Sequence, residues 1–190
     1  TTNSSILAER MAMDRTHGIR KFSNSEINNE SDEIWNYEQQ RLGFNYRLND
    51  IEASLGLSQL KRLDEFVTKR NKIADFYNTN LSNFGIQLPY QINHIYSSYH
   101  LYPIRVSESK GGINQKDLFY KLRDNNIGVN LHYIPIYRQP YFKKLGFKKG
   151  YCKEAELHFS EVLSLPMFSS LSLDNQEYIV HTIKKIIKSN

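Results

Sequence analysis

The longest run of apolar residues at helical spacing begins at Asn49. Asn49 followed by Glu52 three residues later is a capping-box pattern and predicts the start of a helix. The helix is expected to run toward Asn78, and its apolar stripe consists of Ile51, Leu55, Leu63, Phe66, Ile73 and Tyr77. Because a helix of about 30 residues is roughly 45 Å long, we expect it to connect two bodies.

Four shorter amphipathic patterns predict further helices. The first helix is expected to begin after Asn3 as N-cap and to end before Gly18. The last helix is expected to begin at Asp174, because Glu177 follows three residues later in a capping-box pattern. Between them, one helix is expected after Asn114 and another over 152–160. The apolar residues of the first, second and last of these helices are Ile6, Leu7, Met11, Leu118, Phe119, Leu122, Ile179, Ile183, Ile186 and Ile187.

Alternating apolar and polar positions predict two strands. Residues 99–106 alternate, with Pro103 favouring a sheet edge or a bulge. Residues 129–132 follow Gly128 and place Asn130 and His132 on the polar side. An apolar run over 162–167 is interrupted at Pro166. Residues 19–42 lack periodicity and are rich in serine and asparagine, so they are expected to form a loop.

The composition indicates an ordinary globular protein. The chain has 190 residues, of which 39% are hydrophobic and 24% charged. No stretch approaches the roughly 20 apolar residues of a membrane span, and no secretory leader begins the sequence. The single cysteine, Cys152, excludes an intrachain disulfide and a cysteine metal cluster and is expected to be half-buried in a helix. These observations favour a cytoplasmic protein without membrane partners.

The basic charge suggests an anionic partner only weakly. The net charge is +5, but acidic residues are interspersed through most basic stretches. Thirteen tyrosines and ten phenylalanines among basic residues would also suit stacking on single-stranded nucleic acid. Because no RNP, KH or zinc-knuckle pattern is present, a nucleic-acid-binding module is only a distant alternative.

The segment 43–50 is the first candidate for chemistry. Asn45, Tyr46 and Arg47 bring an amide, a phenol and a guanidinium directly before a helix N-terminus, where free backbone N–H groups favour an anion. A phosphate would suit this position. Equally, Asn45 could satisfy a turn while Arg47 meets a nearby carboxylate, and the residues alone do not decide between these readings.

The second candidate is the segment 128–142. His132 lies on the polar side of a predicted strand that runs into an aromatic, proline-containing loop. Tyr133 and Tyr137, with Tyr141, could stack on a nucleobase or could cover the domain surface. A lone histidine is more often structural than functional, so both interpretations stay open for His132 as well.

Several motifs together resemble the DegT/DnrJ/EryC1/StrS family of pyridoxal-phosphate-dependent sugar aminotransferases. The similarity covers nearly the whole chain and follows the family's order of motifs. The motifs are Leu7-Ala8-Glu9-Arg10-Met11, Arg15-Thr16-His17-Gly18, Gly43-Phe44-Asn45-Tyr46-Arg47-Leu48-Asn49-Asp50-Ile51, Ser98-Tyr99-His100-Leu101-Tyr102 and Leu165-Pro166-Met167-Phe168. Within the family, the segments 132–135 and 140–146 resemble most the enzymes that aminate a 4-keto UDP-sugar on the route to pseudaminic acid.

The resemblance implies an α/β fold with an α+β small domain, the C-terminal part of a fold type I aminotransferase. Residues 1–48 would be the tail of the large cofactor domain with a loop that crosses a dimer interface. Residues 49–190 would be the bridging helix and the small domain. It also implies a homodimer with shared active sites, pyridoxal 5'-phosphate as cofactor, and L-glutamate and a UDP-sugar as substrates.

The resemblance further assigns individual residues. Asn45 would bind the cofactor phosphate, while Tyr46 and Arg47 would contact the substrate diphosphate or the cofactor pocket. His132 would lie near the substrate, with Tyr133 and Tyr137 as weaker candidates for the sugar or uracil. The family's Schiff-base lysine matches no residue of this chain, so we expect the chain alone to be inactive. A related aminotransferase or sugar dehydratase specificity is the alternative.

Overall fold

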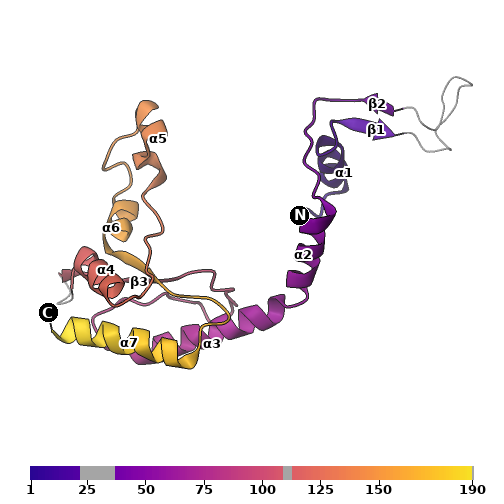
Figure 1. The fold of residues 1–190 in the computed structure, drawn as a ribbon. Coiled ribbons are helices and arrows are strands. Elements are labelled where there is room, and N and C mark those ends of the chain that lie inside the picture. Colours follow the sequence, from indigo (N-terminus) through magenta and orange to yellow (C-terminus); the bar gives the residue numbers. More distant parts are fainter. Residues whose placement is uncertain (22–36, 109–112, 190) are drawn as a thin grey trace, which may run out of the picture. The chain divides into compact units, whose positions relative to one another are not determined.

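The computed structural model describes residues 1–21, 37–108 and 113–189 (Figure 1). The chain divides into two units, Thr1–Lys61 and Arg62–Asn190. Among the described residues, no helix combines the length and the apolar character needed to cross a membrane.

In its described residues, the first unit, unit 1, contains two helices and a short strand pair. Helix α1 spans Ser5–Asp14, and helix α2 spans Asp50–Leu60. Strands β1 (Ile19–Lys21) and β2 (Tyr37–Gln39) pair antiparallel, with Ile19 opposite Gln39. The prediction of a loop over the whole of 19–42 was therefore wrong at 19–21 and 37–39, because pairing between residues distant in the sequence leaves no local periodicity. The rest of that predicted loop, 22–36, lies outside the described residues.

Two glycines allow the backbone of unit 1 to close on itself. Gly18 has a φ of 68°, and a Cβ at this position would lie 1.9 Å from the Arg41 carbonyl oxygen. A Cβ on Gly43 would lie 2.1 Å from the Gly18 nitrogen. No side chain fits either contact, so these positions require glycine.

The predicted long helix is interrupted. The capping box at Asn49 is confirmed, with the Glu52 amide donating to Asn49 Oδ1 at 2.9 Å. Helix α2 ends at Leu60, however, and helix α3 begins at Leu63 and continues to Leu81. The interruption falls at Arg62, whose ψ of 3° leaves the helical range. No glycine or proline there announces it in the sequence.

The second unit, unit 2, is a layered α/β body. Strands β3 (Tyr102–Arg105) and β4 (Val162–Leu165) pair antiparallel, with Tyr102 opposite Leu165. Pro103 lies in β3, an edge strand of this two-stranded sheet, as its sequence predicts. Helix α7 (Leu173–Lys188) packs against α3 and against α4 (Gln115–Asp124), and Figure 1 shows α7 running beside α3.

A single apolar cluster fills unit 2. It draws on α3, both strands, α4 and α7. The predicted alternation over 99–106 is confirmed by the burial of Tyr102, Ile104 and Val106. The fully buried large side chains are Tyr77, Leu81, Tyr102, Ile104, Ile113, Leu118, Leu122, Val129, Val162, Leu163 and Ile183.

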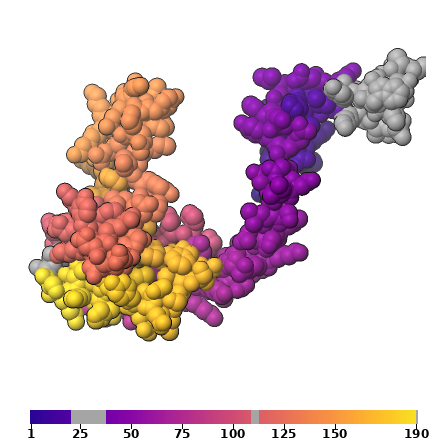
Figure 2. Space-filling view, in the orientation of Figure 1, coloured from indigo at the N-terminus to yellow at the C-terminus, as the bar shows by residue number. Residues whose placement is uncertain are grey.

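An aromatic and basic arm extends from the same unit. It comprises the 3-10 helix η2 (Ile136–Arg138), helix α5 (Pro140–Lys144) and the chain leading to helix α6 (Lys153–Glu161). In Figure 2 the orange segment that contains α5 rises above the red and yellow body of unit 2.

Three details differ from the sequence predictions. The N-caps of α1 and α7 are Ser4 and Ser172, because these hydroxyls accept the amides of Leu7 and Asn175. Residues 129–132 form an isolated bridge between Asn130 and Ser164 in place of a strand. Cys152 is exposed at the N-cap of α6 and is not half-buried.

Candidate functional site

The first candidate site is the loop of residues 43–49. It pairs with the chain that follows α1, since the His17 amide donates to the Phe44 carbonyl at 2.8 Å and the Tyr46 amide donates to the Arg15 carbonyl at 2.9 Å. These bonds hold the loop backbone while leaving the side chains of Asn45, Tyr46 and Arg47 exposed.

Arg47 orients the amide of Asn45. Arg47 Nε donates to Asn45 Oδ1 at 2.9 Å, and Arg47 Nη2 lies 3.4 Å from His17 Nε2. Because a guanidinium has only donors, the Asn45 atom that faces it must be the oxygen. The Asn45 NH₂ group makes no hydrogen bond within the described part of the chain and can donate to an anion.

An anion site at the N-terminus of α2 stays a prediction, and part of the hydrogen-bonding capacity of this helix end is already used. The Asn49 and Glu52 capping box already satisfies two of the first amides of α2, and Asp50 and Glu52 place carboxylates in its first turn. Within the loop, Asn45 and Arg47 are the candidate donors for an anion. Among the described residues, the side-chain partners of Arg47 are Asn45 and His17, and neither of them is a carboxylate.

The Tyr46 side chain presents a ring to solvent. It is 74% exposed and stacks on Phe44, with ring centroids 4.9 Å apart and planes inclined by 17°. A stacked, exposed phenol next to Arg47 can contact a ligand without breaking any buried contact.

The second candidate site centres on His132. Its Nδ1 lies 2.8 Å from the hydroxyl oxygen of Ser164, and its ring meets the Tyr133 ring edge to face at 4.6 Å. The His132 side chain is partly buried, and Tyr133 is 69% exposed. No described residue forms a hydrogen bond with His132 Nε2, which leaves that atom available to a ligand.

Tyr137 faces the interior of the arm. Its hydroxyl oxygen lies 2.9 Å from Glu156 Oε1 and 3.0 Å from the Cys152 carbonyl oxygen, which share its one hydrogen as acceptors, and its side chain is buried. Burial, together with the bond to Glu156, raises the pKa of Tyr137. A substrate contact by Tyr137 would require these bonds to be given up, and its substrate role stays a prediction.

The structure thus groups the candidates in two places. Asn45, Tyr46 and Arg47 are contiguous in unit 1, while His132 and Tyr133 are adjacent in unit 2. Sequence reasoning missed His17 and Ser164. The signal for Ser164 was a hydroxyl inside the apolar run 162–165, since a buried polar group requires a partner.

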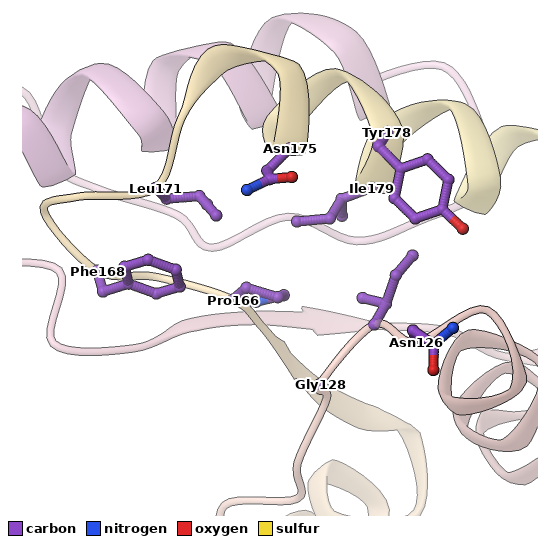
Figure 3. A pocket seen from close by; sticks show the side chains of 9 residues that line it. Asn126, Gly128, Pro166, Phe168, Leu171, Asn175, Tyr178 and Ile179 are labelled. Atoms are coloured by element: carbon purple, nitrogen blue, oxygen red, sulfur yellow. The ribbon is translucent and has the colours of Figure 1, made fainter.

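A separate groove lies between α7 and the segment 126–128. It has a volume of about 290 Å³. Figure 3 shows Leu171, just before α7, and Asn175 and Ile179 of α7 facing Pro166 across it. None of the site residues predicted from the sequence lines this groove.

The fold places the chain in a class of proteins. Solved structures similar over the whole chain are aminotransferases, and the predicted fold class, the C-terminal part of a fold type I aminotransferase, is confirmed. The chain belongs to the DegT/DnrJ/EryC1/StrS aminotransferase family, which matches residues 1–184. The family resemblance predicted from the motifs is therefore confirmed as well.

Three similarities illustrate the relationship. The chain is 31% identical over 191 residues to the spore coat polysaccharide biosynthesis protein SpsC of Bacillus subtilis, covering 99% of this chain and 49% of that protein. It is 31% identical over 189 residues to the UDP-4-amino-4,6-dideoxy-N-acetyl-beta-L-altrosamine transaminase of Helicobacter pylori, covering 99% and 47%. The structure of Helicobacter pylori PseC, an aminotransferase of pseudoaminic acid biosynthesis, matches with a TM-score of 0.82 at 30% identity, covering 100% of this chain and 48% of that one. The chain spans about half the length of these relatives.

Proposed function

We propose that residues 1–190 act as the C-terminal part of a pyridoxal-phosphate-dependent aminotransferase that transfers an amino group from L-glutamate to a 4-keto UDP-sugar. The proposal includes a cytoplasmic homodimer whose two active sites are shared between subunits. The observation that carries it is the Asn45 amide, oriented by Arg47, within a chain about 30% identical to a UDP-sugar transaminase.

The residues present fit a phosphorylated cofactor. The free NH₂ group of Asn45 is a donor of the kind a phosphate accepts. When bound, pyridoxal phosphate supplies the electron sink through which an amino group is moved between donor and acceptor. In this proposal Asn45 holds the cofactor phosphate in the active site of the neighbouring subunit.

The remaining candidates serve the nucleotide sugar. Arg47 and Tyr46 contact the diphosphate or the edge of the cofactor pocket, since a guanidinium matches phosphate oxygens. His132 binds the sugar through Nε2, and Tyr133 offers an exposed ring to the sugar or uracil. Tyr137 contributes to the same surface in the proposal, although its hydroxyl has two partners inside the arm.

A hybrid enzyme tests the proposal. Residues 1–190 are joined to the N-terminal half of the Helicobacter pylori relative, and glutamate-dependent amination of 4-keto UDP-sugars is followed by mass spectrometry. We expect the hybrid to form the amino sugar and the 190-residue chain alone to form none. Retention of the cofactor through gel filtration shows that the hybrid has assembled.

Two outcomes would contradict the proposal. A hybrid that retains the cofactor but aminates no 4-keto UDP-sugar would exclude this substrate class and favour another family activity, such as a different keto-sugar position or dehydration. Salt-dependent binding of the chain to single-stranded nucleic acid, at micromolar concentration or tighter, would instead support the distant alternative.

A further inference from the structure

Strand β4 contains a hydroxyl that its packing does not require. Val162, Leu163 and Leu165 are buried apolar residues, and Ser164 between them is only 4% exposed. Burying a hydroxyl is unfavourable unless it is hydrogen-bonded. Alanine or valine would fill an apolar strand position without this cost, so the hydroxyl needs an explanation beyond packing.

That explanation lies in His132. Among the described residues, His132 Nδ1 is the one hydrogen-bond partner of the Ser164 hydroxyl, at 2.8 Å. The backbones are joined as well, since the Ser164 amide donates to the Asn130 carbonyl at 2.8 Å. Ser164 of strand β4 therefore holds the backbone at Asn130, two residues before His132, and also holds the His132 ring.

The hydrogen of the Ser164 hydroxyl decides which ring nitrogen carries a proton. If Nδ1 of His132 carried it, Nδ1–H would donate to Ser164 Oγ, and the buried hydroxyl hydrogen would have no acceptor among the described residues. If Ser164 donates to Nδ1, both the buried hydroxyl hydrogen and Nδ1 have a partner, and the proton of the neutral ring lies on Nε2. An unsatisfied buried donor is disfavoured, and this cost selects the second arrangement.

We propose that Ser164 is a positioning residue that fixes neutral His132 in the Nε2–H form, so that His132 donates a hydrogen bond to an oxygen of the nucleotide sugar. The substrate part of this inference rests on the proposed function. The Ser164 part is a property of the chain alone. Ser164 touches no ligand itself and acts through the ring that it orients.

The tautomer is measured directly on the 190-residue chain. Nitrogen-15 NMR of the histidine rings at about pH 8.5, well above the ordinary histidine pKa of ~6.5, distinguishes protonated from unprotonated ring nitrogens. His132→Gln identifies the His132 signals. We expect the proton on Nε2 in the wild type. A proton on Nδ1 would overturn the proposal without reference to any enzyme activity.

Substitution of Ser164 isolates its contribution. Ser164→Ala should move His132 toward a mixture of both tautomers, whereas Ser164→Thr, which keeps a hydroxyl, should retain the Nε2–H form. The rings of His158 and His181, on α6 and α7, serve as internal controls and should not change. If Ser164→Ala does not fold, the wild type and Ser164→Thr still decide the point. An unchanged tautomer in a folded Ser164→Ala protein would overturn it.

The substrate part is tested in the hybrid enzyme. Ser164→Ala should lower kcat/KM for the keto sugar by roughly three- to tenfold, mainly through KM, while cofactor retention stays at the wild-type level. An unaltered KM together with an altered tautomer would overturn the donor role of His132. A hybrid without any activity would count against the proposed function, while the NMR result would still decide how Ser164 positions His132.

Discussion

Units 1 and 2 differ in what stabilises them. Unit 2 buries a continuous cluster of apolar side chains, from Ile73 on α3 to Ile186 on α7. In unit 1, none of the apolar side chains described in residues 1–20 and 38–61 is buried. Leu42 is 88% exposed and Ile51 84%. Exposed apolar surface on this scale is typical of an interface. Unit 2 therefore contains its own core, whereas the described apolar side chains of unit 1 do not form one.

Backbone contacts replace a core in unit 1. The strand pair, the bonds between residues 14–17 and 44–46, and the close approach of Gly18 and Gly43 define its local structure. Such contacts specify a conformation but contribute little hydrophobic free energy, because they bury little apolar area. We therefore expect the two units to respond differently to the same kind of substitution.

The largest contrast is expected for leucine truncation. Leu122→Ala on α4 should reduce the free energy of unfolding of unit 2 by about 2–5 kcal/mol, because the side chain is fully buried and its removal leaves a cavity. The matched change Leu55→Ala on α2 removes an exposed side chain and should alter stability by no more than about 0.5 kcal/mol. Urea denaturation followed by circular dichroism measures both. If both substitutions lowered the free energy of unfolding equally, unit 1 and unit 2 would not differ in how apolar side chains stabilise them.

A glycine pair in unit 1 should give the next largest effect. Gly43→Ala places a Cβ 2.1 Å from the Gly18 nitrogen, and since this contact involves backbone, the loop must move. We expect a destabilisation of roughly 1–3 kcal/mol, seen as loss of amide protection in the β1–β2 pair by hydrogen exchange.

Gly56→Ala is the control within the same unit. A Cβ at Gly56, inside α2, meets nothing within 4 Å, so the change should stabilise the helix by about 0.5–1 kcal/mol. If Gly43→Ala left the exchange of β1 and β2 unchanged, the close contact between Gly18 and Gly43 would not be a determinant of unit 1.

The sequence predicted elements whose signals are local. The capping box at Asn49 and the cap at Asn114 are confirmed. Each cap is a hydrogen bond between a side chain and the amide three residues later, so a short stretch of sequence is enough to predict it. At the start of α1, Asn3 and Ser4 are both good caps, and adjacent capping residues do not reveal which one is used. The interruption at Arg62 has no signal of its own.

The contacts of the candidate site also fall into two groups, those between residues close in the sequence and those between residues far apart. The bond between Asn45 and Arg47 joins residues two positions apart and could be anticipated from the motif. The contacts of Arg47 with His17 and of His132 with Ser164 join residues 30 and 32 positions apart. Such pairings depend on how the chain folds back, and no periodicity in one segment contains them. The roles assigned to Asn45 and His132 stay predictions.

Buried tyrosines should make unit 2 sensitive to alkali. Burial raises the pKa of Tyr77 and of Tyr102 far above the ordinary value of 10.0. Between the unfolded and folded pKa values the folded state binds more protons, so stability is complete below pH 10 and falls as the pH rises above it. Each tyrosine reduces the free energy of unfolding by up to about 1.4 kcal/mol per pH unit.

Tyr77→Phe tests this titration. The variant loses the bond from the Tyr77 hydroxyl to the Pro166 carbonyl and should be less stable at pH 7. Above pH 10 its stability should fall less steeply than that of the wild type, because one titrating group is absent. Unfolding free energies at pH 7, 10 and 11 give the slope. Parallel slopes would show that Tyr77 does not control the alkaline transition.

The smallest contrast is expected at two helix N-caps of similar geometry. Asn49 caps α2 in unit 1 through the Glu52 amide, and Ser172 caps α7 in unit 2 through the Asn175 amide. Removing a cap costs about 1 kcal/mol of helix stability. Because α7 is packed into the core, Ser172→Ala should transmit this loss to the unfolding of unit 2. Because α2 buries no side chain, Asn49→Ala should instead fray its first turn, with faster amide exchange at Glu52 and Ala53, and leave the unfolding midpoint of unit 2 unchanged. A lower midpoint after Asn49→Ala would mean that the two units unfold as one, and the contrast between them would then have to be abandoned.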